Sequence, residues 1–127
     1  MSCLAGNMIF LIVDDSKISR KWLIEMIPKK ILENTTIIEG TNGQEAIDLF
    51  VKHQPDVIFL DITMPVIDGF EALEKIIHIQ KEAIVVMVSA DRQKSTKEKV
   101  LALGASAIIA KPIDADEFRA TLLKLVF

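Results

Sequence analysis

The chain has 127 residues, half of them hydrophobic, so it has the size of one domain with a sizeable core. Its net charge of −3 and isoelectric point near 5.4 argue against the basic surface of proteins that bind nucleic acid or anionic membranes directly. The single cysteine, Cys3, excludes an internal disulfide and a cysteine-based zinc site.

The N-terminus predicts no targeting or membrane segment. It lacks a basic region followed by a long apolar core, and no apolar run in the chain approaches the roughly 18 residues of a membrane span. We therefore expect a cytoplasmic protein. Residues 1–7 are predicted to be a disordered extension, and residues 8–127 to form the folded domain.

Short apolar runs alternate with helix-compatible segments along the whole chain. The predicted strands lie near residues 8–13, 36–39, 56–60, 84–88 and 107–110. This alternation is typical of βα units that build a parallel sheet, and the continuously apolar runs indicate strands covered on both faces. We predict a doubly wound α/β fold with five parallel strands in the order 2-1-3-4-5, as in flavodoxin-like proteins.

The predicted helices begin at recognisable caps and turns. Ser16 caps a first helix that Pro28 ends or kinks, and Asp114 caps the last helix. Three more helices are expected at 44–52, from Gly69 to about residue 80, and at 93–103, the last being polar until Val100. Apolar spacing places two sets of side chains on inward faces, Ile18, Trp22, Leu23, Met26 and Ile27 in the first helix and Ala46, Ile47, Phe50 and Val51 in the second.

Polar side chains follow four of the five predicted strands. Asp14 and Asp15 end the first strand, Asp61 the third, Ser89 the fourth and Lys111 the fifth. In an open parallel sheet these ends share one edge, where ligands bind at the point at which the strand order reverses. In the order 2-1-3-4-5 the first and third strands are neighbours, so the three acids should converge there. The second strand offers nothing comparable.

Three clustered carboxylates need a compensating cation. Two carboxylates about 5 Å apart repel by roughly 3 kcal/mol at an effective dielectric constant near 20, so three pairs cost about 10 kcal/mol. Domain stability is itself only about 5–15 kcal/mol. Lys111 can neutralise one charge, and an all-oxygen site selects Mg²⁺ over softer metals. Taken alone, Asp14 and Asp15 could instead be a helix cap and a favourable charge at a helix N-terminus.

A carboxylate beside Mg²⁺ can act as a nucleophile toward a phosphoryl group. Asp61, central among the acids, is the best candidate for forming an aspartyl phosphate, with Asp14 and Asp15 as the metal-holding residues. Lys111 and Ser89 would stabilise the charge that develops on the phosphoryl oxygens.

Taken together, these motifs resemble the receiver domain of two-component response regulators, of the single-domain CheY-like type. The resemblance covers residues 8–127, and its spacing is specific: Asp14-Asp15, Asp61 followed by Met64-Pro65 and Asp68-Gly69, Ser89-Ala90 and Lys111-Pro112.

The resemblance implies a signalling phosphoprotein in a phosphorelay rather than an enzyme with external substrates. Asp61 would accept the phosphoryl group from a histidine kinase or histidine phosphotransfer protein, with small phosphodonors as substitutes. Asp15 and the Thr63 carbonyl would bind Mg²⁺ directly and Asp14 largely through water. Ser89 and Lys111 would contact the phosphoryl group, and a cis peptide bond is expected before Pro112. The output would be a changed protein-binding surface.

One position departs from the family pattern. The switch aromatic commonly stands three residues before the lysine, where this chain has Ile108, and the chain contains no tyrosine. Phosphorylation would then act by shifting the loop after Ser89 and the polar helix that follows it. Thr63 and Asp91 occupy positions that resemble those tuning the phosphoryl lifetime.

Two other functions stay open at this stage. A phosphohydrolase of the haloacid dehalogenase type also phosphorylates an aspartate at a strand end, but needs a second acid two residues later, where this chain has Thr63. A phosphorylation-independent interaction module would retain the fold alone. His53 and His78 lack ligand spacing and are predicted at the surface, Trp22 and the methionines are predicted in packing, and Lys94, Lys97 and Lys99 form a solvated face or a partner surface.

Overall fold

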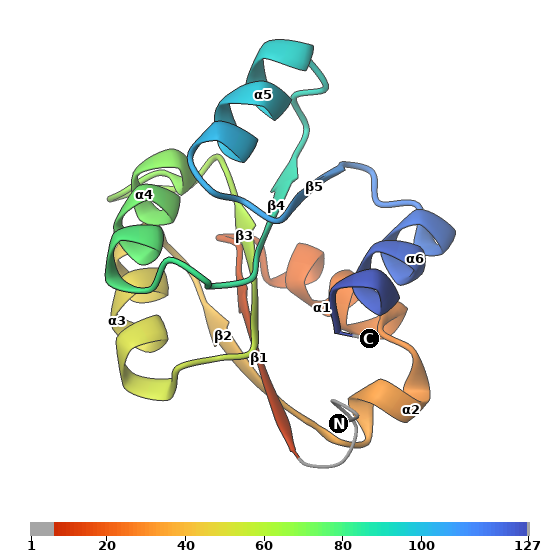
Figure 1. The fold of residues 1–127 in the computed structure, drawn as a ribbon. Coiled ribbons are helices and arrows are strands. Elements are labelled where there is room, and N and C mark those ends of the chain that lie inside the picture. Colours follow the sequence, from red (N-terminus) through yellow and green to blue (C-terminus); the bar gives the residue numbers. More distant parts are fainter. Residues whose placement is uncertain (1–6, 127) are drawn as a thin grey trace.

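Five parallel strands form the centre of the protein in the computed structural model, which describes residues 7–126 (Figure 1). The strand order is β2-β1-β3-β4-β5, the order expected for a flavodoxin-like fold. The strands are β1 (Met8–Val13), β2 (Thr35–Gly40), β3 (Val57–Asp61), β4 (Val85–Ser89) and β5 (Ala107–Ala110). Of the predicted extension at 1–7, only residue 7 lies within the described part, so the disorder of that segment stays a prediction.

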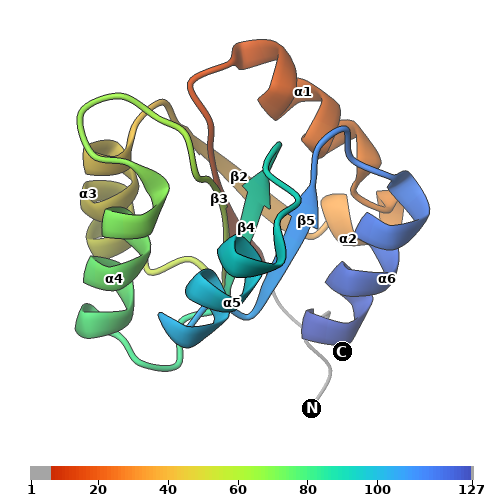
Figure 2. The ribbon, with the colours of Figure 1, turned by 90° about the horizontal axis from the view of Figure 1, so that it is seen from above.

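Helices cover both faces of the sheet (Figures 1 and 2). On one face lie α1 (Lys17–Met26), α2 (Lys29–Leu32) and α6 (Ala115–Val126). On the other lie α3 (Gly43–His53), α4 (Gly69–Ile79) and α5 (Lys94–Ala102). The segment after Pro28 forms the short helix α2. No helix in the described part is long and apolar enough to cross a membrane.

Side-chain caps begin most of the helices. The side chain of Ser16 accepts a hydrogen bond from the Ser19 backbone N–H, and Asp68 accepts one in the same way from Glu71. The Asp114 carboxylate accepts hydrogen bonds from the N–H groups of Asp116 and Glu117. These bonds satisfy N–H groups that a helix leaves unpaired in its first turn. The predicted caps at Ser16 and Asp114 are confirmed.

Two apolar layers flank the sheet because successive strand residues point to opposite faces. Leu11, Ile58 and Leu60 pack under α3 and α4, whereas Phe10, Ile12 and Phe59 pack under α1 and α6. Phe59 contacts the Phe118 ring of α6 at a centroid distance of 5.5 Å. Since these strands are buried on both faces, their position is firmly fixed, and so is the edge that carries the acids.

Three apolar side chains predicted to face inward are instead exposed. Trp22 is 60% exposed, Ile18 59% and Val51 56%. The buried stripe of α1 runs through Arg20, Leu23 and Ile27, and Trp22 lies about 100° around the helix from Leu23. Val51 stands in the same relation to buried Phe50 on α3. The predicted faces were too wide, because each helix packs against the sheet along a narrower stripe.

Candidate functional site

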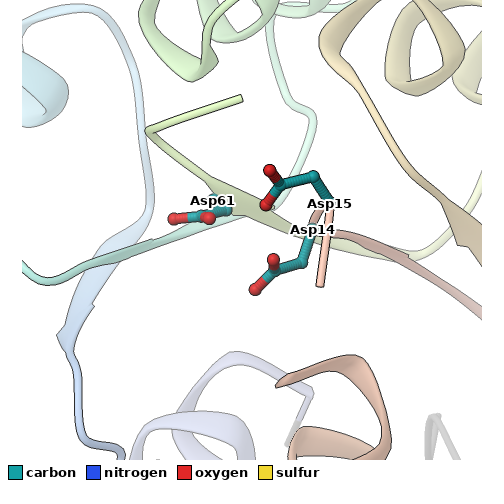
Figure 3. A group of neighbouring side chains, drawn as sticks. All are labelled: Asp14, Asp15 and Asp61. Carbon is teal, nitrogen blue, oxygen red and sulfur yellow. The ribbon is translucent and has the colours of Figure 1, made fainter. Parts of the chain in front are cut away.

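The three predicted acids lie together at one edge of the sheet. The β1–β3 register pairs Val13 with Leu60, so the next residues, Asp14 and Asp61, occupy matching positions on neighbouring strands. Asp15 follows on the turn into α1, and Figure 3 shows the three side chains gathered there. One carboxylate oxygen from each of the three lies within 4.8 Å of the other two. The convergence predicted from the strand order is confirmed.

Lys111 neutralises part of this cluster. Its Nζ lies 2.9 Å from Asp14 Oδ2 and 3.3 Å from Asp61 Oδ2, bridging the ends of β1, β3 and β5. Asp14 is 6% exposed and Asp61 7%, whereas Asp15 is open to solvent. The peptide bond between Lys111 and Pro112 is cis, as the family resemblance implied.

Burial and charge move the ionisation of two of these groups. Burial raises the pKa of Asp61; the Lys111 charge opposes this shift and the Asp14 charge adds to it. For Lys111, burial alone would lower the pKa, but the hydrogen bond to Asp14 and the charges of Asp61 and Asp14 outweigh it and raise the pKa. The Lys111 amine therefore stays protonated. For Asp61, the Lys111 charge does not offset the effect of burial, so the ionised carboxylate is less favourable than it would be in water.

Ser89 lies at the same edge but does not bond to the acids. Its side chain is buried, and its Oγ accepts a hydrogen bond from the Asp91 N–H at 2.9 Å. The backbone N–H of Lys111 donates to the Ser89 carbonyl, so strands β4 and β5 hold the two residues side by side. The hydroxyl is thus near the cluster and is engaged with its own loop.

The loop after Ser89 is tied to the first turn of α5 through Asp91. One Asp91 carboxylate oxygen accepts from the Gln93 N–H at 2.9 Å, and the other accepts from the Thr96 hydroxyl at 2.6 Å. The Thr96 and Gln93 hydrogen bonds lower the pKa of Asp91. Sequence reasoning assigned Asp91 only a position that tunes the phosphoryl lifetime, and it missed these bonds because they depend on the loop's conformation.

The loop that carries Thr63 ends at Gly69, which packs closely against the backbone of Asp61 and Ile62. Thr63 lies two residues beyond Asp61 with an exposed side chain, and the assignment of its carbonyl stays a prediction. The Gly69 N–H donates to the Ile62 carbonyl at 2.7 Å, and a Cβ on Gly69 would lie only 2.4 Å from the Asp61 carbonyl oxygen. Only glycine allows α4 to begin this close to the third acid.

Arg20 is a site neighbour that sequence reasoning missed. It is buried on α1, where its Nη1 donates to the Asp14 carbonyl oxygen and its Nε donates to Glu39 Oε1 at 2.8 Å. The signal was present, since Arg20 precedes Leu23 and Ile27 by three and seven residues and so shares their buried stripe. Through Glu39, strand β2 does contribute to this edge, contrary to the expectation that it offers nothing comparable.

The donor set fits a hard divalent cation. Oxygen ligands about 2.0–2.1 Å from a Mg²⁺ ion lie up to about 4.2 Å apart, a span that the three carboxylates match with small adjustments. No cysteine or histidine takes part in the described cluster, which disfavours softer metals. Asp14, Asp15 and Asp61 are therefore suited to hold Mg²⁺.

Comparison with known proteins decides the family. Residues 10–123 match the response regulator receiver domain model. The chain belongs to the response regulator receiver family. It is 37% identical to the chemotaxis protein CheY of Bacillus subtilis, over 84% of this chain and 87% of the relative. It is also 36% identical to CheY of Listeria monocytogenes, over 90% and 94% of the two chains.

The fold of a solved receiver agrees with this assignment. The Borrelia burgdorferi CheY in a crystal structure of a CheX–CheY–BeF3–Mg complex superposes with a TM-score of 0.86 at 31% identity, covering 96% of this chain and 91% of that one. The receiver family accounts for the flavodoxin-like fold, the acidic edge and a role in two-component signalling.

Proposed function

We propose that this receiver accepts one phosphoryl group on Asp61 in a Mg²⁺-dependent reaction. The observation that supports the proposal best is the convergence of three carboxylates within 4.8 Å, with the Lys111 amine bonded to two of them. Such a cluster is costly for a structural role alone, because Asp14 and Asp61 are both buried.

Each residue has a distinct part in the proposed reaction. An Asp61 carboxylate oxygen forms the new bond to phosphorus while the bond from phosphorus to the donor nitrogen breaks. Asp14, Asp15, Asp61 and the Thr63 carbonyl would hold Mg²⁺, which would neutralise phosphoryl oxygens when bound. Lys111 would move its hydrogen bond from Asp61 to a phosphoryl oxygen, and the Ser89 hydroxyl would donate to another.

The donor we propose is a histidine kinase or a histidine phosphotransfer protein in the cytoplasm. The Borrelia burgdorferi CheY was crystallised in complex with a protein, CheX. This supports the proposal that our chain, too, signals by binding another protein. For this chain, the exposed polar helix α5 beside Ser89 is the proposed reporting surface. With a net charge of −3, neither nucleic acid nor a membrane is a proposed partner.

Incubation with acetyl phosphate and Mg²⁺, followed by intact mass measurement, tests the proposal. We expect the addition of one phosphoryl group to the wild type and none to Asp61→Asn. Asp68→Asn is the matched control, because Asp68 ends the loop that follows Asp61 and asparagine also caps helices. Addition to Asp61→Asn at the wild-type level would contradict the assignment of Asp61.

Thermal unfolding tests the metal. Mg²⁺ should raise the unfolding midpoint of the wild type more than that of Asp15→Ala, because binding to the folded state stabilises it. Asp116→Ala removes an exposed acid from α6 and should respond to Mg²⁺ like the wild type. Equal shifts in all three proteins would remove Asp15 from the metal site.

The same mass experiment separates the two rival functions. A phosphohydrolase of the haloacid dehalogenase type would release phosphate steadily without retaining the group, but Thr63 stands where its second acid is needed. A phosphorylation-independent module would take up no phosphoryl group at all. The receiver is expected to retain one phosphoryl group and to turn over no external substrate.

A further inference from the structure

Arg20 is a buried cation for which the proposed phosphoryl chemistry has no role. Only 9% of the residue is exposed, in the second turn of α1 and on the stripe that packs against the sheet. Burying a charge is costly unless an opposite charge and hydrogen bonds compensate for it. An apolar residue would fill this position more simply, so the contacts of Arg20 indicate why an arginine is there.

Arg20 holds the peptide group that joins two of the acids. Its Nη1 donates to the Asp14 carbonyl oxygen at 2.5 Å, and its Nε donates to Glu39 Oε1 at 2.8 Å. That carbonyl belongs to the planar peptide group between Asp14 and Asp15. The orientation of this plane sets the direction in which the Asp15 side chain leaves the backbone. The guanidinium therefore acts on the exposed acid without touching it.

Without Arg20 this peptide group would have fewer restraints. The Asp14 carboxylate is held on its own side by the Ser16 N–H at 2.8 Å and by Lys111 Nζ at 2.9 Å. The exposed Asp15 side chain has no hydrogen-bond partner among the described residues. Its position depends on the backbone, and Arg20 binds the carbonyl of the peptide group that precedes Asp15.

We propose that Arg20 is a positioning residue for the metal site. It fixes the peptide plane between Asp14 and Asp15 so that both carboxylates stand ready for Mg²⁺, and Glu39 on β2 anchors the guanidinium. The inference rests on the proposed function, since these are the acids proposed to hold the metal. Residues that orient metal ligands typically change metal affinity about 10–100-fold when they are replaced.

Arginine suits this position better than lysine. Its rigid fork donates in two directions at once, here to the Asp14 carbonyl just after β1 and to the Glu39 carboxylate on β2. A lysine at this position would keep the positive charge but concentrate it on one nitrogen. Arg20→Lys therefore separates the effect of geometry from the effect of charge.

Mg²⁺ titration by isothermal calorimetry tests the inference. We expect Arg20→Gln to raise the Mg²⁺ dissociation constant about tenfold and Arg20→Lys to raise it by a smaller factor. Lys21→Gln is the control, because it removes a neighbouring exposed charge from the same helix and should leave the dissociation constant unchanged. Circular dichroism and urea unfolding of each variant show that the titrated protein is folded.

The outcomes separate this inference from the proposed function. If Arg20 served only as a buried ion pair, its variants would unfold at lower urea concentration but bind Mg²⁺ as tightly as the wild type, and the inference would be overturned. If Arg20→Gln does not fold, Arg20→Lys carries the test with the same two outcomes. Failure of the wild type itself to bind Mg²⁺ would instead remove the proposed metal site.

Discussion

The two sides of the candidate site are built differently. On the acid side, Asp14 is bonded to Lys111 and its carbonyl to Arg20, and Asp61 ends a strand buried along its whole length. On the other side, Ser89 leads into α5, which buries only Thr96 and Val100. By contrast, α4, which begins beside Asp61, buries four residues. Few buried contacts make a segment the first to open or shift.

This difference indicates that the two sides have different roles, a fixed site for the proposed reaction and a movable element for the proposed signal. The proposed phosphoryl transfer needs groups that are held in place before the reaction, and the acid side would supply them. A signal needs an element that can move at low cost, and α5 meets that need because Asp91 is its main polar tie to Ser89. Since Ile108 stands where a switch aromatic is expected, this tie is a bonded route from Ser89 to α5 that needs no aromatic side chain.

The largest expected effect comes from breaking the acid side at Gly69. A Cβ there would lie 2.4 Å from the Asp61 carbonyl oxygen and 2.5 Å from Ile62 Cα, and backbone atoms cannot yield easily. We expect Gly69→Ala to lower the free energy of unfolding by about 3 kcal/mol or more, measured by urea denaturation.

Gly40→Ala is the matched control for that prediction. Its added Cβ would meet the flexible Leu49 side chain at 3.3 Å rather than backbone, so the loss should stay below about 1 kcal/mol. Equal losses in the two variants would show that the close approach at Gly69 is not what constrains the acid side.

Sequence patterns were enough to place the residues whose positions depend on strand order. Asp14 and Asp61 follow continuously apolar runs, and parallel strands put their ends at one edge, so their convergence required only the order of the strands. The helix caps at Ser16 and Asp114 were equally local, because each cap bonds within three residues of itself.

Features that depend on tertiary packing were harder to predict from the sequence. Trp22 has the spacing of a buried residue. The rotation of α1 on the sheet nevertheless leaves Trp22 exposed and buries Arg20. Spacing alone gives a helix face to within about one residue, or about 100°. The bond from Thr96 to Asp91 likewise depends on a loop conformation that no periodic pattern specifies.

A second and smaller effect on stability is expected from the ionisation of Asp61, on the acid side. Because burial raises the pKa of Asp61 above its ordinary value of 3.8, its ionised form is less favourable in the folded chain than in the unfolded one. This penalty is absent below the ordinary pKa, grows as the pH rises through the raised pKa, and is complete above it. Without Mg²⁺, Asp61→Asn should therefore be more stable than the wild type at neutral pH, on the order of 1 kcal/mol.

Urea unfolding at a series of pH values checks this sign. The advantage of Asp61→Asn should shrink as the pH falls toward 3.8 and should reverse at neutral pH when Mg²⁺ is added, since only the wild type keeps the full set of acids. Asp48→Asn, an exposed acid on α3, should change little at any pH. A lasting advantage in acid would indicate that the ionisation of Asp61 is not the cause.

The smallest expected effect concerns the tie between Ser89 and α5. Thr96→Val keeps the shape of the side chain but removes the hydroxyl that donates to Asp91 at 2.6 Å. We expect amide hydrogen exchange in α5, from Lys97 onward, to become faster by a factor on the order of five, with the amides of β1 and β3 unchanged. Ser95→Ala removes an exposed neighbouring hydroxyl and should leave exchange in α5 as it is. Faster exchange throughout the sheet would instead mean that α5 and the acid side open as one unit, and the proposed division between them would fail.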